Sequence, residues 1–368
     1  MFELAIAKSE LLPRLLMVAG AVDKRQSLAI LSNILLYIRQ NRLVLTATDL
    51  EIEISAALEC VSSTADGGIT VPAKKFIDIV RSLDDEITPT IKAQDNAVVI
   101  KAGRSQFKLA ILPADQFPAS EQELPEVEFS VAKSEFIHLL QSTHFAMSQQ
   151  DVRVFLNGLL LEFAGNSITS VATDGHRMAI CKLASDKIHT LHRLLLPRKG
   201  VHEILRLLNS VPDESINIAA GKGHFSLTTA EYTFTSKLIE ARFPPYIKAI
   251  PVDNDKFVLI ERESFKRALS RIIILANEKS RAVMLHIQPG CLTLVANNQE
   301  QEEATESIEA QVDGNDLKIG VNASYLMDVL NFMPDALVRL SMSTTDRSIL
   351  VESLANENYQ YIIMPMKL

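Results

Sequence analysis

Residues 71–76 read Val-Pro-Ala-Lys-Lys-Phe, and a similar stretch returns twice along the chain. Residues 196–201 read Leu-Pro-Arg-Lys-Gly-Val, and residues 321–326 read Val-Asn-Ala-Ser-Tyr-Leu. The copies begin at positions 71, 196 and 321, so they lie 125 residues apart both times. Solenoid repeats are far shorter, at roughly 20 to 50 residues. A period of this length is typical of whole domains, so the sequence predicts three similar domains in one chain.

A second marker keeps almost the same period. Residues 46–49 read Thr-Ala-Thr-Asp, residues 171–174 read Val-Ala-Thr-Asp, and residues 295–298 read Val-Ala-Asn-Asn. The last residue of this marker is at 49, 174 and 298, which gives separations of 125 and 124 residues. Two independent markers with one period indicate a duplication of the whole domain, and three similar domains in a row suggest an arc.

Each third also has the same predicted order of elements: a short strand, a helix, strands, a second helix and more strands. Phe265, Leu269 and Ile272 belong to an apolar stripe with helical spacing. Ile52 and Ile54 alternate with polar residues, which is typical of a half-buried strand. We therefore predict an α+β fold in which each domain packs two helices on antiparallel sheets. Proline-rich stretches mark the boundaries, and the predicted domains are 1–125, 126–250 and 251–368.

The composition of the chain limits the class of protein. Its 368 residues are 47% hydrophobic, which is enough for two or three cores. No apolar run approaches the roughly 18 residues of a membrane span, and residues 1–5 do not resemble a signal peptide. Cys60, Cys181 and Cys291 lie far apart without a CxxC pair, so neither a disulfide framework nor a zinc site is expected. We therefore expect a reduced, cytoplasmic protein.

The net charge of −8 argues at first against binding to nucleic acid, because phosphates attract Lys and Arg. The distribution of charge matters more than its sum, however. Basic residues gather on or beside the predicted helices, whereas the acidic ones concentrate in 121–128 and 300–309. An acidic protein with one basic surface is therefore compatible with the sequence.

Residues 173–177, Thr-Asp-Gly-His-Arg, permit an enzymatic interpretation with Asp174 and His176 as an acid/base pair. The third copy has Asn298 at the position of Asp174, and Asn cannot act as an acid. Asp and Asn share turn-forming chemistry, so these residues are predicted to end strands in turns. No nucleotide-binding loop, HExxH motif or other metal-ligand spacing is present, and we expect no enzymatic activity, cofactor or metal.

Several longer motifs resemble those of one family. They are 171–177 (Val-Ala-Thr-Asp-Gly-His-Arg), 196–200, 234–238, 242–244, 277–279 and the terminal 364–368 (Met-Pro-Met-Lys-Leu). Together with the length and the threefold plan, these resemble the bacterial sliding clamps, the β subunits of the replicative DNA polymerase III. The resemblance implies a DNA clamp fold and a head-to-tail homodimer that forms a ring of six domains. Such a ring encloses double-stranded DNA without reading its sequence and tethers the polymerase.

The resemblance also implies three sets of functional residues. Those that face or contact DNA are Arg25, Lys74, Gln150, Phe155, Arg198, Lys199, Asn322 and Tyr325. A groove for short partner peptides contains Leu156, Thr173, Gly175, His176, Arg177, Met178, Pro244, Lys248, Ala249, Ile362, Met364, Pro365, Met366 and Leu368. The dimer interface contains Phe107, Leu109, Ile274 and Leu275, flanked by Lys75, Arg104, Glu300, Glu302 and Glu303.

The residues themselves give partial support to the groove and to the interface. The chain end at 361–368 is almost wholly apolar, and such an end must be docked or must line a binding surface, for which Met is well suited. It could equally be an ordinary buried strand. The Glu residues in 300–309 and the basic Lys101, Arg104 and Lys108 are complementary in charge, so an edge of domain three could meet an edge of domain one from a second chain.

The leading hypothesis is therefore a clamp that encircles DNA. The resemblance implies the polymerase III catalytic subunit, other DNA polymerases and repair proteins as partners. It also implies a separate ATP-driven clamp loader, in agreement with the lack of a nucleotide-binding motif in this chain. The alternatives are a peptide-binding scaffold that acts without DNA and a small-molecule enzyme with a site at Asp174 and His176.

Overall fold

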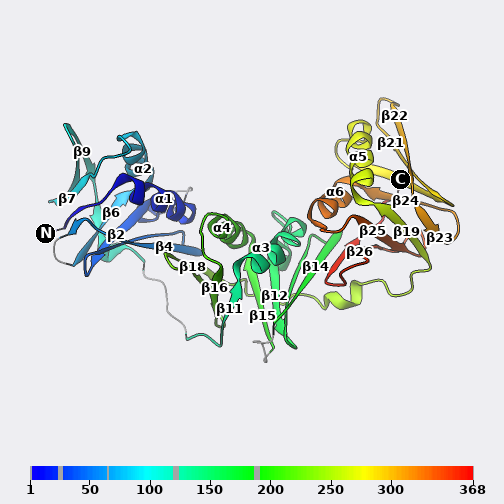
Figure 1. Ribbon diagram of the computed structural model, residues 1–368, viewed down its shortest axis with the longest axis horizontal. Helices are drawn as coiled ribbons and strands as arrows, with labels where there is room; N and C mark the ends of the chain where they lie inside the picture. Colours follow the sequence, from blue (N-terminus) through cyan, green and yellow to red (C-terminus); the bar gives the residue numbers. More distant parts are fainter. Residues whose placement is uncertain (1, 24–27, 64–65, 119–123, 186–190, 368) are drawn as a thin grey trace. The chain divides into compact units, whose positions relative to one another are not determined.

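The computed structural model describes residues 2–23, 28–63, 66–118, 124–185 and 191–367 (Figure 1). Arg25 and Leu368, two of the predicted site residues, lie outside these ranges. The chain divides into two compact units, of which the first contains Met1–Ser134 and His202–Leu238. The second contains Glu135–Val201 and Ile239–Leu368. The middle third of the chain is thus shared between the two units.

The described chain contains six α-helices, two in each third, as the sequence predicts. The second helix of each third begins directly after Pro72, Pro197 or Asn322, so the repeated stretch marks a junction between a strand and a helix. At Asn322 the side-chain oxygen accepts a hydrogen bond of 2.9 Å from the amide of Ser324, which caps the helix. The helices are α1 Lys8–Val18, α2 Ala73–Ser82, α3 Lys133–Gln141, α4 Arg198–Leu208, α5 Arg262–Ile272 and α6 Ala323–Phe332.

The first unit contains a five-stranded and a nine-stranded sheet. In spatial order the small sheet consists of β5 Ser62–Ser63, β1 Glu3–Ala5, β7 Thr90–Gln94, β8 Ala97–Ala102 and β9 Ser105–Ala110. The large sheet consists of β10 Leu112–Pro113, β6 Gly67–Pro72, β2 Asn33–Arg39, β3 Arg42–Thr48, β4 Ile52–Glu59, β18 Tyr232–Lys237, β17 His224–Thr228, β16 Ser215–Ala220 and β11 Val127–Ala132.

The second unit repeats this plan with a nine-stranded and a four-stranded sheet. The large sheet consists of β15 His192–Pro197, β12 Gly158–Ala164, β13 Ser167–Thr173, β14 Arg177–Ala184, β27 Tyr359–Ile363, β26 Ile349–Ser353, β25 Leu337–Met342, β19 Lys256–Glu261 and β23 Gln311–Asp313. The small sheet consists of β22 Glu303–Glu309, β21 Cys291–Asn297, β20 Ala282–Gln288 and β24 Leu317–Asn322.

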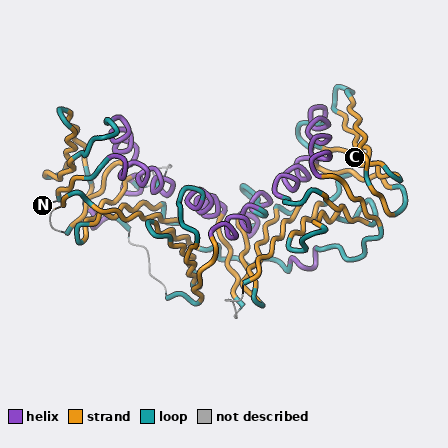
Figure 2. Tube along the Cα trace, in the orientation of Figure 1, coloured by secondary structure: helices purple, strands orange, loops and turns teal. Residues whose placement is uncertain are grey.

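The core of each unit lies between the helices and one face of its sheets (Figure 2). Along β3 and β4, Leu43, Leu45, Ile52 and Ile54 are buried, while the residues between them are partly exposed. This alternation follows from the period of two along a strand. Every strand pair between named strands in the described residues is antiparallel, for example β13 with β14, so the predicted α+β fold with antiparallel sheets is confirmed.

Both small sheets end in an edge strand. In the first unit this strand is β9, on which Phe107 and Leu109 are partly exposed. In the second unit it is β22, on which Glu303 is exposed. An edge strand leaves one row of backbone donors and acceptors without a strand partner, which makes it able to pair with another chain.

The three cysteines are free thiols. Burial raises the pKa of the Cys60 thiol and raises the pKa of Cys181 to about 12, so both stay protonated and unreactive near neutral pH. In the described ranges no helix is long and apolar enough to cross a membrane.

Candidate functional site

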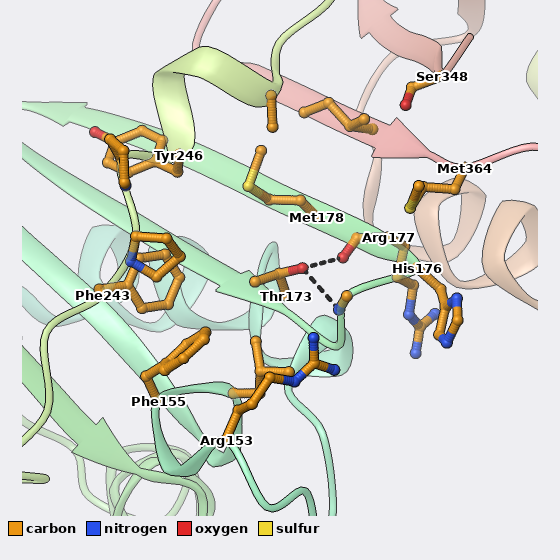
Figure 3. Close-up of a pocket in the computed structure, with 16 residues that line it drawn as sticks. Arg153, Phe155, Thr173, His176, Arg177, Met178, Phe243, Tyr246, Ser348 and Met364 are labelled. Atoms are coloured by element: carbon orange, nitrogen blue, oxygen red, sulfur yellow. Dashed lines mark hydrogen bonds between the residues drawn. The ribbon is translucent and has the colours of Figure 1, made fainter. Parts of the chain in front are cut away.

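A pocket of about 370 Å³ opens on the second unit, on the face of the large sheet away from the helices (Figure 3). Its floor consists of residues from β14 and β27, and its walls come from four segments, at 153–156, 173–176, 243–249 and Ser348. Its lining residues are Arg153, Phe155, Leu156, Thr173, Gly175, His176, Arg177, Met178, Phe243, Pro244, Pro245, Tyr246, Ala249, Ser348, Ile362 and Met364.

The floor is apolar because this part of the sheet is hydrophobic on both of its faces. Leu160, Val171, Met178 and Ile362 form a buried cluster on the pocket face of β12, β13, β14 and β27. Opposite side chains, such as Leu159 and Leu161, are buried on the helix face. A sheet covered on both faces has continuous apolar runs instead of alternation. The pocket therefore offers apolar contacts to a ligand.

The turn before β14 shapes one end of the pocket. The Asp174 Oδ1 atom accepts hydrogen bonds of 2.9 and 3.0 Å from the amides of His176 and Arg177. The Thr173 hydroxyl donates to the Arg177 carbonyl at 2.6 Å and accepts from the Gly175 amide at 3.1 Å (Figure 3). Gly175 has a φ of +89°, a conformation that suits glycine.

The predicted turn role of the Asp/Asn marker is confirmed in all three copies. Asp49 accepts hydrogen bonds from the amides of Glu51 and Ile52, and the Asn298 side-chain oxygen accepts one from Glu302 at 3.0 Å. Because the Asp174 side chain is held by backbone amides and by Arg177, it is not arranged as the acid of an acid/base pair with His176.

Arg177 connects the pocket to α6 and to the loop before β12. Its guanidinium group forms an ion pair of 3.1 Å with Asp174 and one of 2.5 Å with Asp328 of α6, and it donates to the Phe145 carbonyl at 2.7 Å. The guanidinium carbon lies 4.5 Å from the centre of the Tyr325 ring. Since the side chain is only 12% exposed, Arg177 acts as a structural support for the pocket wall.

We expect Arg177→Met to lower the stability of the second unit. Removing one member of a largely buried ion pair leaves Asp174 and Asp328 without their cation, at a cost of about 3 kcal/mol. This corresponds to a fall in Tm of about 6–12 °C for a unit of this size, measured by differential scanning calorimetry. Arg153→Met is the matched control, since Arg153 is exposed and pairs only with Asp151 among the described residues. Equal Tm values for the two variants would contradict this role of Arg177.

Arg153 lies at the mouth of the pocket (Figure 3). Its Nε and Nη2 atoms donate to the two carboxylate oxygens of Asp151, both at 3.0 Å. These hydrogen bonds lower the pKa of Asp151 to about 2, so the carboxylate is charged near neutral pH. The pair thus keeps the guanidinium group in a fixed place at the rim.

Most of the predicted groove residues lie together in this pocket. Lys248 is exposed beside Ala249 and does not line the pocket. The Met366 amide donates to the Gly320 carbonyl at 2.8 Å, so the end of the chain is docked on β24. The groove residues that line the pocket are Leu156, Thr173, Gly175, His176, Arg177, Met178, Pro244, Ala249, Ile362 and Met364; Lys248, Pro365 and Met366 do not.

The sequence prediction missed six lining residues. One signal could have revealed the pocket face: the uninterrupted apolar runs at 159–161 and 178–181, which differ from the alternating strands of the first third. The residues that were missed are Arg153, Phe155, Phe243, Pro245, Tyr246 and Ser348.

Several residues that were predicted to contact DNA have side chains that already interact with other residues of the protein. Phe155 lines the pocket, where its ring packs edge-on against Phe243 with centroids 6.2 Å apart. Asn322 caps α6, and Tyr325 stacks on Arg177. Arg198 donates to the Met147 carbonyl at 2.9 Å, and burial lowers its pKa.

Many basic residues on the helices are likewise held by the protein. Lys8 is buried and pairs with Asp85 at 2.8 Å, and Arg14 pairs with Glu10 and Glu231. By contrast, Lys74 and Gln150 are exposed. The sequence therefore contains more basic residues on the helices than can contact a DNA phosphate, because some of them are already paired within the protein. On α2 and α5, Lys74, Lys75, Lys266 and Arg267 have no ion pair within the described ranges.

The predicted interface residues lie on or beside the two edges. Ile274 is 76% exposed in the turn η7 (Ile273–Leu275) that follows α5. Phe107 and Leu109 are on β9, where Arg104 is exposed in the preceding turn. Lys75 is exposed on α2, and Glu300, Glu302 and Glu303 are exposed at the start of β22. Glu306 of β22 pairs instead with Arg271 of its own unit, at 2.5 Å.

Three features define the class of protein. They are a domain plan that is repeated along the chain, small sheets with edge strands, and an apolar pocket beside the C-terminal strand. Family models of the DNA polymerase III beta subunit match residues 2–121 (N-terminal domain), 130–245 (central domain) and 247–367 (C-terminal domain). The chain belongs to this family, the sliding clamps that serve DNA polymerase III as processivity subunits.

Individual relatives agree with this assignment. The chain is 43% identical over 364 residues to the beta sliding clamp of Pseudomonas aeruginosa and 37% identical over 363 residues to that of Escherichia coli, with 99% of both chains covered each time. It superposes on the P. aeruginosa clamp bound to griselimycin with a TM-score of 0.96 at 42% identity, and on the Caulobacter crescentus clamp with a TM-score of 0.96 at 33% identity, with full coverage of each chain. A scaffold that acts without DNA is not favoured by these relatives.

Proposed function

We propose that this chain forms a head-to-tail homodimeric ring that encircles double-stranded DNA and holds polymerase on it. The observation that carries the proposal is the match of three clamp domains over nearly the whole chain. Among the described residues, Arg198 donates to the Met147 carbonyl, whereas Lys74 is exposed. A tether that slides needs only weak, sequence-independent contacts with phosphates, so a small number of mobile cations fits this function.

The apolar pocket of the second unit would receive short peptides from partner proteins. Its volume of about 370 Å³ and its floor of Met178 and Ile362 suit apolar side chains of an extended peptide. Met364 is 49% exposed at its edge and can adapt to different partners. The C. crescentus clamp carries polyethylene glycol in a region described as a putative beta-motif tethering region. We propose that the polymerase III catalytic subunit, the clamp loader, other polymerases and repair proteins bind here through a peptide with Gln and an apolar-aromatic end.

The ring would close where β9 of one chain meets β22 of another. Both strands are sheet edges, and their flanks carry opposite charges, basic near Arg104 and acidic near Glu303. A head-to-tail contact of this kind produces a closed ring if its rotation fits. The domains of that ring would be 1–125, 126–250 and 251–368. We further propose a non-catalytic protein of the cytoplasm, associated with the nucleoid at replication forks.

Retention on circular DNA tests the encirclement. After assembly by a clamp loader, labelled protein should stay on a nicked circular plasmid during gel filtration. It should be lost when the plasmid is cut once, because an enclosing ring slides off a free end. Retention on both forms would indicate adhesion and would refute the proposal, and raising the salt concentration separates the two cases, since adhesion weakens with salt.

A further inference from the structure

A second hollow of about 500 Å³ lies on the first unit, on the exposed face of its large sheet. It lies over β2, β3 and β4 and is bordered by the loop that follows β10. Its lining residues are Leu35, Tyr37, Thr46, Glu53, Ala114, Asp115, Phe117 and Pro118.

This hollow occupies the same place in the first copy of the repeat as the pocket does in the second copy. Thr46 and Glu53 are 125 residues before Val171 and Met178, which belong to the apolar floor of the pocket. Leu35 corresponds in the same way to Leu160. The Phe-Pro pair at 117–118 recurs at 243–244, and both phenylalanines are buried.

The backbone around the two sites also corresponds. Glu53 pairs with Thr235 of β18, and Met178 pairs with Ile362 of β27. Two residues further along those partner strands, the Lys237 amide donates to the Glu51 carbonyl at 2.8 Å and the Met364 amide donates to the His176 carbonyl at 2.9 Å. The hollow and the pocket are therefore built on one backbone template.

The side chains of the hollow differ from those of the pocket, and this difference changes the kind of ligand that the site fits. The position of Val171 is occupied by the hydroxyl-bearing Thr46, and the position of Met178 by the carboxylate of Glu53. Asp115 adds a second carboxylate at the border. Tyr37, 41% exposed, and Leu35 still offer an apolar surface. A site of this composition complements a ligand that has both an apolar group and a positive charge.

We propose that the hollow is a second peptide-docking site of this chain, for an extended segment with a Lys or Arg next to an apolar side chain. The apolar side chain would contact Leu35, Tyr37 and Phe117, and the cation would face Glu53 and Asp115. The pocket of the second unit and this hollow would then select peptides of different charge. This inference goes beyond the clamp function, because encirclement of DNA requires no such site.

The test uses the full chain with Met178→Gln, which makes the floor of the apolar pocket polar without adding a charge, and two fluorescent tetrapeptides, Leu-Lys-Ala-Phe and Leu-Glu-Ala-Phe. We expect the lysine probe to bind about fivefold more tightly than the glutamate probe at low salt, a typical gain for partly exposed charge pairs. A benzophenone group on the lysine probe should crosslink to residues 33–48 or 114–118. Adding Glu53→Gln with Asp115→Asn should abolish the preference, whereas the exposed Glu128→Gln should preserve it.

A second double variant controls for a loss of preference that arises only from a perturbed surface. Thr46→Val with Glu53→Met should give the hollow the preference of the apolar pocket, so that the lysine probe loses its advantage. Binding of neither probe, crosslinks outside the hollow, or an unchanged preference after removal of both carboxylates would overturn the proposal. None of these outcomes alters retention on circular DNA, which separates this proposal from the function above.

Discussion

A chain carrying Ile274→Ala and Leu275→Ala is expected to sediment as a monomer and to be lost from circular DNA. Ile274 is 76% exposed directly after α5, whose Arg271 pairs with Glu306 of the edge strand β22, so a chain that pairs with this edge would cover it. Each replacement removes about three buried carbon groups from the proposed contact, or about 2 kcal/mol. A closed dimeric ring contains this contact twice, so the loss is about 8 kcal/mol per dimer, roughly a millionfold in the dimerisation constant.

Sedimentation velocity over a range of protein concentrations measures the change. Leu354→Ala is the matched control, because Leu354 is also a large exposed apolar residue of the second unit but follows β26 of the large sheet, whereas β22 belongs to the small sheet. It should remain dimeric. A double variant that stays dimeric at nanomolar concentration would show that the chains meet elsewhere, and circular dichroism distinguishes dissociation from unfolding.

Met178→Glu should weaken the binding of a pentapeptide that begins with Gln and ends in Leu-Phe by about 100-fold. Met178 is buried in the apolar cluster of the pocket floor, beside Ile362 and Val171. A carboxylate at this point must lose water when an apolar peptide covers it, which costs about 2–3 kcal/mol. The first copy of the repeat has a carboxylate, Glu53, at the matching position, where the side chain is partly exposed.

Fluorescence polarisation with the labelled peptide gives the affinity. Val154→Glu adds the same charge beside the pocket without lining it, and its affinity should stay within a few-fold of wild type. Met364→Ala and a chain that lacks residues 364–368 should also bind more weakly, because Met364 lines the pocket. If Met178→Glu binds as tightly as the unchanged chain, the peptide docks at another surface.

The sequence predicted the organisation of the chain because the organisation is repeated. A period of 125 residues places the second helix of each third after Pro72, Pro197 and Asn322, and the structure begins α2, α4 and α6 at the next residues. The exchange of Asp174 for Asn298 between copies predicted a turn, and backbone amides bind both side chains. Such local features depend on a few neighbouring residues, so pattern alone is enough to predict them.

The roles of individual polar and aromatic residues needed the tertiary structure. The sequence predicts basic residues on or beside the helices, but two of them, Lys8 and Arg14, have partners, Asp85 and Glu231, that are distant along the chain. Phe155 packs in the pocket against Phe243, which is far from it in sequence.

The sequence by itself determined the threefold plan, the antiparallel α+β fold and the turns, because spacing and turn chemistry are local. Only the tertiary structure decided which side chains line the pocket, which cations are already paired and that the first copy has a hollow at the matching place. A pocket or an ion pair depends on which strands and loops meet, and residues such as Thr46, Glu53 and Phe117 meet only after the sheet has formed.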